Sequence, residues 1–245
     1  MMAHDTYVQD GKMLFSTDFT ALNNSGVEGR AVLLLDQNTH SLTVDIQASG
    51  LQPGEMHIQH IHGFTNDMDA KSPTIAQDSD GDGFVELGEG VATYGPIQLN
   101  LTLNPENSVH DHGTAGHDHT DQAMFPTADA NGKLSYHEVF NFAANDPNAK
   151  AIFDGITPLE AKEIVIHGLT TNANQGVGTG GEVDGTAGYK LVLPVASGEL
   201  NGVAPAADVL AAVHDLGLKA NDVVDWNAIA AHVTENFETT GHWFL

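Results

Sequence analysis

The 245-residue chain contains no cysteine, which excludes disulfide bonds, thiolate metal sites and a cysteine nucleophile. Basic residues are scarce as well: 8 lysines and arginines stand against 33 acidic residues, and the formal net charge at pH 7 is −25. Such a surface repels nucleic acids and anionic membranes and attracts cations. Any metal site must therefore use carboxylates or histidines, and the chain has 14 histidines.

Long apolar runs are missing too. No stretch approaches the roughly 18 consecutive apolar residues of a membrane-spanning helix, so we expect no membrane span. The first residues, MMAHDTYVQDGK, lack the basic start and apolar segment of a secretory signal peptide. If the protein is exported, its signal was removed earlier or it uses another route.

The first part of the chain has the pattern of β-strands. Strands are predicted at 13–19, 27–36 and 41–48, and apolar and polar residues alternate in the first and third of them. In the third strand, Leu42, Val44 and Ile46 share one face, which is typical of an antiparallel sheet with one solvated side. The length suits one large β domain or one and a half ordinary domains.

Three histidines follow a turn at Pro53-Gly54, on a strand predicted from Met56 to His62. Side chains alternate along a strand, so His60 and His62 share a face and His57 points away from them. Two imidazoles on one face favour metal ligation over strand histidines that only form hydrogen bonds. Imidazole suits zinc, copper, iron or nickel, so the residue type does not choose the metal.

A second strand, 163–169, contains another histidine, His167. The segments Gly50-Leu-Gln-Pro-Gly-Glu and Gly155-Ile-Thr-Pro-Leu-Glu each precede a strand ending in Ile-His-Gly at the same spacing. This internal echo puts His62 and His167 in equivalent positions.

Residues 64–148 are rich in Asp, Gly, Asn and Pro, and we predict a long loop insertion there. Residues 78–89 fulfil every position of the twelve-residue calcium loop. The expected calcium ligands are Asp78, Asp80, Asp82, the Phe84 carbonyl and Glu89. The flanks are poor helix formers, so we expect the loop without its usual helix-loop-helix frame.

Two further segments of this interval carry metal-ligand residue types. Residues 127–138 fit the calcium template at Asp129, Asn131 and Glu138, but Thr127 replaces the first carboxylate, so calcium binding and a plain turn into a strand remain equal alternatives. The tract 110–121 alternates histidines with acids and is either a disordered scavenging tract or a source of additional ligands, with metal binding slightly favoured. Its histidines are His110, His112, His117 and His119.

The remaining chain holds a glycine-rich loop at 172–188, a strand at 189–195, and two short amphipathic helices at 205–216 and 225–237. The loop lacks the Lys-Ser/Thr ending of a phosphate-binding loop. The helical tail could pack on the core, dock a partner or form a homo-oligomer.

Several of these motifs resemble the copper/zinc superoxide dismutases. That family's copper-binding strand is similar to Gly50-Leu51-x-x-Gly54 followed by His57-x-x-His60-Ile61-His62. Its last copper-ligand strand is similar to Val165-Ile166-His167. Its Gly-Asn-Ala-Gly-x-Arg-Leu motif is similar to Gly185-Thr186-Ala187-Gly188-Tyr189-Lys190-Leu191. The resemblance implies a Greek-key antiparallel β-sandwich over residues 1–202, interrupted by the insertion 64–148 and followed by a helical extension, 203–245. Chordin-type (CHRD) domains share the Gly-Leu turn and the His-Ile-His-Gly strand.

The resemblance implies that His60, His62 and His167 bind copper and that His57 braces the ligand-bearing strand. It also implies that Lys190, in place of the family's arginine, attracts the superoxide anion. The family's zinc-ligand pattern is absent after His62, and the fourth copper ligand has no counterpart apart from the histidines of the tract 110–121.

The leading hypothesis is therefore superoxide dismutation at a histidine-ligated copper, with calcium ordering the insertion. The alternative is a non-catalytic extracellular module of the CHRD type that binds calcium together with copper or zinc. A zinc hydrolase is a third reading, but a carboxylate general base beside the ligands is not evident. Free calcium is plentiful outside cells, so we expect a secreted, periplasmic or cell-surface protein.

Overall fold

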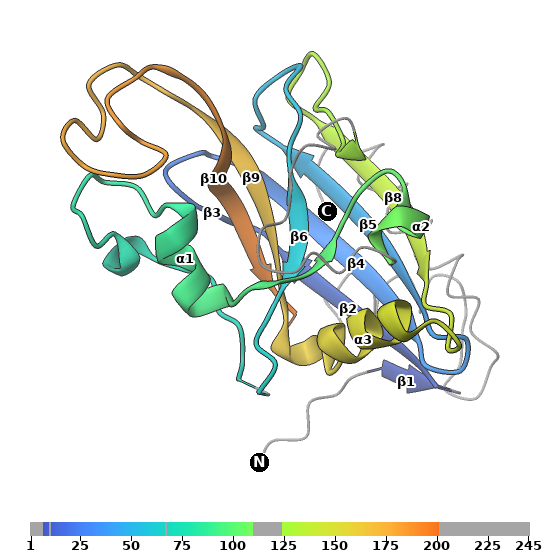
Figure 1. Ribbon diagram of the computed structural model, residues 1–245. Coiled ribbons are helices and arrows are strands. Elements are labelled where there is room, and N and C mark those ends of the chain that lie inside the picture. The colour runs from blue at the N-terminus through green and yellow to red at the C-terminus, as the bar shows by residue number, and fades with distance from the viewer. Residues whose placement is uncertain (1–6, 10, 67, 110–123, 201–245) are drawn as a thin grey trace.

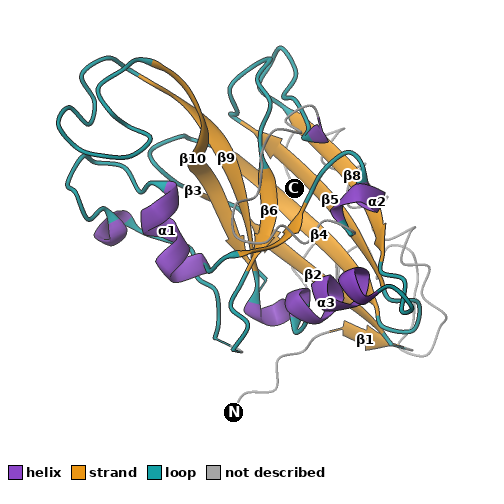
Figure 2. Ribbon diagram, in the orientation of Figure 1, coloured by secondary structure: helices purple, strands orange, loops and turns teal. Residues whose placement is uncertain are grey.

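The protein is mainly β, with two antiparallel sheets and few helices (Figures 1 and 2). The computed structural model describes residues 7–9, 11–66, 68–109 and 124–200. This architecture confirms the antiparallel β-sandwich predicted from the sequence. The predicted helices at 205–216 and 225–237 and the histidine-rich tract lie outside the described residues.

The first sheet has five strands in the order β1-β2-β4-β5-β8. Their bounds are β1 (Tyr7–Gln9), β2 (Lys12–Asp18), β4 (Glu28–Asp36), β5 (Ser41–Ser49) and β8 (Leu134–Asn141). The predicted strands at 13–19, 27–36 and 41–48 are confirmed to within one residue. The apolar side chains at 42, 44 and 46 are fully buried against the other sheet, because alternation directs them all to the inner face.

The second sheet has the order β3-β10-β9-β6-β7. Its strands are β3 (Thr20–Ala21), β10 (Gly188–Glu199), β9 (Glu163–Thr171), β6 (Gln59–His62) and β7 (Ile97–Asn100). Strands β6 and β9 are about a hundred residues apart in the chain but pair directly. On their inner face, Ile61, Ile164 and Ile166 are fully buried in the core.

The helical elements are short. They are η1 (Ile75–Gln77), α1 (Leu87–Tyr94), α2 (Pro105–Ser108), α3 (Pro147–Ile156) and η3 (Leu159–Ala161). Helix α3 lies at one end of the sandwich (Figure 1) and adds Ala149, Ile152 and Ile156 to the core. Asp146 caps it by accepting hydrogen bonds from the backbone of Asn148 and Ala149, with Pro147 at the first helical position.

The interval 64–148 is more than the loop insertion that the sequence suggested. It contains α1, α2 and two strands, of which β7 pairs with β6 and β8 pairs with β5. The interval thus supplies an edge strand to each sheet. The division of the chain at 64, 148 and 202 stays a prediction. In the described part of the chain, no helix is both long and apolar enough to cross a membrane.

Candidate metal centre

Strands β6 and β9 bring three histidines together on the outer face of the second sheet. His60 pairs with Val165, His62 pairs with Glu163, and the His167 amide donates to the Ile58 carbonyl at 2.8 Å. Directly opposed residues share a face, so His60, His62 and His167 point the same way. The core isoleucines of these strands occupy the opposite face.

The three imidazoles converge. Ring centroids are separated by 5.5 Å for His60 and His62, 5.3 Å for His60 and His167, and 6.1 Å for His62 and His167. One ring nitrogen from each can be chosen so that all three lie within 4.8 Å of one another, and the residues are only 1–2% exposed. The arrangement could hold one metal ion in an enclosed site.

Backbone carbonyls orient two of the rings. His62 Nδ1 lies 2.9 Å from the Gly95 oxygen, and His167 Nδ1 lies 2.7 Å from the Val192 oxygen. A carbonyl only accepts, so we assign the proton to Nδ1 in both rings, which leaves Nε2 unprotonated. Nε2 of His62 is buried and has no hydrogen-bond partner in the described part of the chain. This is the form in which imidazole binds metals.

Burial also keeps His62 neutral. Desolvation, reinforced by the nearby His167, lowers the pKa of His62 to about 3. A neutral imidazole needs no deprotonation before it binds a metal ion at neutral pH. The cost of keeping this imidazole neutral is therefore part of the folding free energy and does not reduce the metal affinity.

His57 contacts the backbone of the third histidine. Its Nδ1 lies 2.9 Å from the His167 oxygen and its Nε2 lies 3.3 Å from the Gln52 oxygen. Burial lowers the pKa of His57, although the two carbonyls oppose the shift. The ring is fully buried and meets Tyr189 edge-on at 5.9 Å. His57 thus links the turn before β6 to the ligand position on β9.

Three neighbours of the histidines were not singled out in the sequence. Phe125 lies edge-on to His60 at 5.6 Å, and Tyr94 lies 4.6 Å from His62. Glu163, opposite His62, is fully buried and accepts a hydrogen bond from the Ser72 hydroxyl at 2.8 Å; burial raises its pKa to about 7. Only Glu163 left a signal in the sequence, as an acid in phase with His167 on a buried strand.

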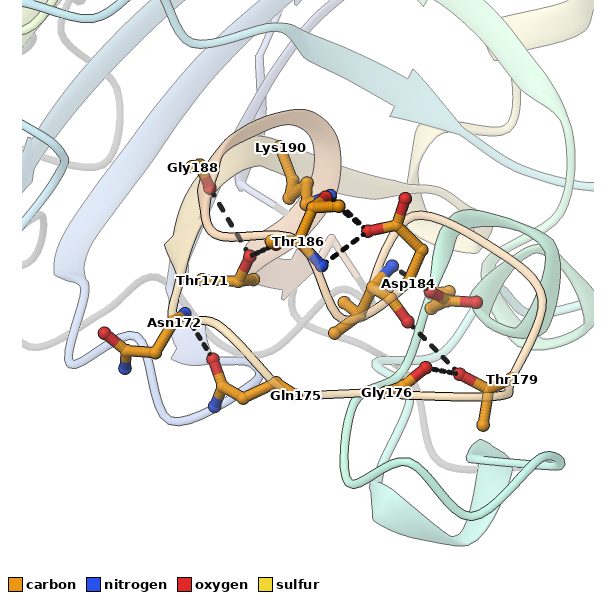
Figure 3. A network of polar contacts seen from close by, with 11 residues as sticks. Thr171, Asn172, Gln175, Gly176, Thr179, Asp184, Thr186, Gly188 and Lys190 are labelled. Carbon is orange, nitrogen blue, oxygen red and sulfur yellow. Dashed lines mark hydrogen bonds and ion pairs between the residues drawn. The ribbon is translucent and has the colours of Figure 1, made fainter.

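Lys190 belongs to a polar network in the glycine-rich loop (Figure 3). Its ammonium group donates to Asp184 Oδ1 and to Thr186 Oγ1, each at 2.9 Å, and its side chain is 15% exposed. Hydrogen bonds that Asp184 accepts, first from the Thr186 hydroxyl and then from Lys190, lower the pKa of Asp184. The positive charge of Lys190 is therefore partly neutralised, and its role toward an anionic substrate stays a prediction.

The second group of candidate ligands is the loop predicted to bind calcium. Asp78, Asp80 and Asp82 each place a carboxylate oxygen within 4.8 Å of the others. Asp78 accepts hydrogen bonds from the backbone of Gly81 and Gly83, which folds the loop around its carboxylate. Burial, together with the nearby acids, raises the pKa of Asp82. A bound cation would relieve this repulsion.

The flank of this loop differs from the expectation. Helix α1 begins at Leu87 despite two glycines, so the loop has a helix on its C-terminal side and the 3-10 turn η1 on the other. Glu89, in the first turn of α1, turns back to accept from the Ser79 amide at 2.6 Å. The C-terminal flank is therefore helical, contrary to the prediction for that flank, while the loop still lacks a pair of flanking helices. Phe84 is buried against Val183 and Leu193.

The weaker calcium loop folds as a turn into β8. Asp129 accepts hydrogen bonds from the backbone of Asn131 and Lys133, and Glu138 lies within β8 opposite Val44. Calcium binding by Asp129, Asn131 and Glu138 stays a prediction. The other candidate ligands, His110, His112, His117 and His119, lie outside the described residues.

Comparisons with known proteins add a distant likeness. No protein-family model and no curated protein matches the chain. Among solved structures, a SOD-like protein from Bacillus subtilis is similar at 14% sequence identity and a TM-score of 0.33, covering 76% of this chain and 97% of that one. The likeness is one of fold and is too distant to carry an argument about function.

Proposed function

We propose that the protein binds copper through His60, His62 and His167 and dismutes superoxide. The observation that carries the proposal is the convergence of three buried imidazoles, two with Nδ1 held by a backbone carbonyl. The buried Nε2 of His62 fits a metal ion, since it has no hydrogen-bond partner in the described structure. Copper stands highest among the divalent first-row metals in affinity for nitrogen sites.

Copper held by these imidazoles would supply one-electron redox chemistry, in which one superoxide is oxidised to oxygen and another, with two protons, is reduced to hydrogen peroxide. The chain itself provides orientation and exclusion of water. His57 supports the His167 backbone, while Phe125 and Tyr94 pack against the other two rings. Because the ligands are 1–2% exposed, the site suits only a very small substrate.

In this proposal Lys190 provides local attraction for the anion. The formal net charge of −25 repels superoxide at long range, so a nearby cation matters more than in a neutral protein. Lysine retains the charge of the family's arginine but lacks its planar fork. The ion pair with Asp184 weakens this attraction, so the contribution of Lys190 should be modest.

A second candidate is a non-catalytic metal- and calcium-binding module of the CHRD type. Two observations favour it: the near-complete burial of the ligands and the pairing of Lys190 with Asp184. In that case the metal at the three histidines would be copper or zinc, held for structure or storage. Calcium in the loop 78–89 is part of both candidates, and its abundance outside cells supports a secreted, periplasmic or cell-surface location.

The two candidates are separated by metal analysis and superoxide decay. Wild type, His60→Ala and Lys190→Ala are loaded with copper and dialysed, with His137→Ala as the control, since its side chain is 64% exposed on β8. We expect about one copper per chain in wild type and control, little in His60→Ala, and fast decay only where copper is retained. Lys190→Ala should keep copper and slow the reaction.

If wild type retains copper but removes superoxide no faster than His60→Ala, the enzyme proposal fails and the binding module remains. Equal copper content in wild type and His60→Ala would refute the proposed metal site itself.

A further inference from the structure

The last turn of α1 lies directly on His62. Tyr94 is fully buried, and its ring centroid is 4.6 Å from that of His62 at an interplanar angle of 65°. The next residue, Gly95, provides the carbonyl that accepts from His62 Nδ1 at 2.9 Å. Two consecutive residues therefore contact the same imidazole, one on the ring and one on a nitrogen.

The end of α1 is also fixed to the strand that carries His62. Gly95 has φ +81°, and an added Cβ would lie 2.6 Å from both the carbonyl carbon and the oxygen of Gly63. The Gly63 amide in turn donates to the Pro96 oxygen at 3.1 Å. Backbone contact of this kind prevents the helix end from sliding along β6.

Gly90 makes room for the tyrosine. Glycine inside a helix is less favourable than alanine, so its presence in the middle of α1 needs a reason. An added Cβ at Gly90 would lie 2.5 Å from Cε1 and 2.7 Å from the hydroxyl oxygen of Tyr94. The ring thus lies back over Gly90, four residues earlier on the same helix face, and its hydroxyl donates to the Leu87 oxygen at 3.3 Å.

We propose that Tyr94, seated on Gly90, is a positioning residue that fixes the ring plane of His62 so that Nε2 faces His60 and His167. The inference rests on the proposed metal site and states what holds one of its ligands in place. Tyr94 packs against the ring, and the Gly95 carbonyl fixes the tautomer. Partners of this kind commonly change metal affinity by about 10- to 100-fold when they are lost.

Gly90→Ala gives the sharpest test, because it improves the intrinsic helix preference of α1 while displacing the tyrosine ring. Tyr94→Leu removes the ring, and Tyr94→Phe keeps it. Tyr136→Leu is the matched control, because Tyr136 is also a buried tyrosine but lies on strand β8. Its hydroxyl donates to the Thr102 oxygen at 2.8 Å.

Cu(II) alone is titrated into each metal-free variant, and the electron paramagnetic resonance spectrum is recorded. We expect Gly90→Ala and Tyr94→Leu to weaken copper binding about tenfold and to change the spectrum. Tyr94→Phe should stay within about threefold of wild type, and Tyr136→Leu should keep both affinity and spectrum. Wild-type affinity and spectrum in Gly90→Ala and Tyr94→Leu would overturn the proposal.

A second readout needs no metal. Nitrogen NMR of the metal-free protein reports the tautomer of His62, which should be Nδ1–H in wild type and in Tyr136→Leu, and a mixture in Gly90→Ala. An unchanged tautomer in Gly90→Ala with unchanged copper binding refutes the positioning role. Failure of wild type to bind copper, with the tautomer shift present, would instead refute the proposed function and leave the positioning role intact.

Discussion

At the scale of single residues, His57 shows how a side chain outside the ligand set can control the site. Both ring nitrogens face backbone carbonyls, those of His167 and Gln52. A neutral imidazole has one N–H, so it can donate to only one of them at a time. The shorter contact, 2.9 Å to His167, places that donor next to a proposed ligand.

We predict that His57→Ala lowers the free energy of unfolding by about 1–3 kcal/mol, because it leaves a buried carbonyl without its donor. Copper affinity should fall by about tenfold as the His167 backbone shifts. Urea unfolding and copper titration measure the two effects. His137→Ala, on the exposed side of β8, serves as the control for copper affinity only, because its ring bonds to the buried Asp45 at 2.6 Å. Copper affinity of His57→Ala equal to that of wild type would contradict the bracing role.

Glu163 gives a pH prediction of definite sign. Its pKa rises from an ordinary value of 4.5 to about 7 on folding, because burial penalises the charged form. The folded protein therefore binds more protons than the unfolded chain between these values, and stability from this group is lost as the pH rises from 4.5 through 7. His62, with its lowered pKa, acts in the opposite direction, losing stability as the pH falls below 6.5.

Glu163→Gln should remove the first effect and leave the second. Since one pKa unit corresponds to about 1.4 kcal/mol and the pKa rises from 4.5 to about 7, we expect the variant to be roughly 3 kcal/mol more stable than wild type at pH 8. At pH 5 the difference should largely vanish. Urea unfolding of the metal-free proteins at both pH values measures this, and a variant less stable than wild type at pH 8 would show that the carboxylate is stabilised by its serine neighbours.

At the scale of elements, the calcium loop and α1 form one unit. Glu86 and Glu182 join it to the glycine-rich loop: the Val183 amide donates to Glu86 at 2.6 Å, and the Leu87 amide donates to Glu182 at 3.1 Å. Asn23 adds a third link, because it donates to both the Val85 and Pro194 oxygens at 2.9 Å. An ion in the loop would therefore stabilise contacts with β10 as well.

We predict that calcium at a hundred times its dissociation constant raises the free energy of unfolding by about 2.7 kcal/mol. Asp80→Asn should abolish most of this gain, because it removes the charge of a proposed ligand. The variant keeps the turn contacts that Asp78 makes, so the loop should still fold. Thermal unfolding with calcium or with a chelator measures the response. Asp69→Asn, at an exposed position outside the loop, should respond like wild type; an equal response from Asp80→Asn would refute the site.

The elements also show where sequence patterns sufficed. Alternation showed which side chains of β5 face the core, although β4 is buried along most of its length, and the parity of His60 and His62 gave their shared direction. Strand β8 was predicted only as one of two alternatives, because a calcium template overlaps it, although Leu134, Tyr136 and Phe140 alternate into the core. Helix α1 forms although it contains two glycines, because the packing of Tyr94 over Gly90 outweighs the low helix propensity of glycine. Backbone partners such as Gly95 have no sequence signature, since only the fold brings them to the site.

At the scale of the whole molecule, the large negative net charge affects the stability of the folded state. With a formal net charge of −25, the like charges of the folded protein repel one another. The unfolded chain holds the same charges farther apart, so this repulsion destabilises the folded state. Raising potassium chloride from 0.01 to 0.15 M shortens the screening length from about 30 to about 8 Å. The folded state should gain stability as a result.

We predict a higher melting temperature at the higher salt concentration, with a gain of about 1 kcal/mol shifting it by about 2–4 °C. Scanning calorimetry in a chelator-treated buffer measures the shift without a contribution from calcium. The same comparison near pH 4.5, where the sequence pI lies, is the control and should show little change. A salt effect of equal size at both pH values would point to a cause other than charge.

The two faces of β6 and β9 have different roles: one packs the core, and the other carries the candidate metal ligands. The isoleucines that pack the sandwich and the histidines that could hold a metal occupy alternate positions on the same strands. Substituting the histidines changes an outer layer and leaves the inner packing in place. We therefore expect the ligand set to be replaceable while the inner isoleucine layer keeps the two sheets together, which makes the sandwich a suitable frame for building metal sites of a different composition.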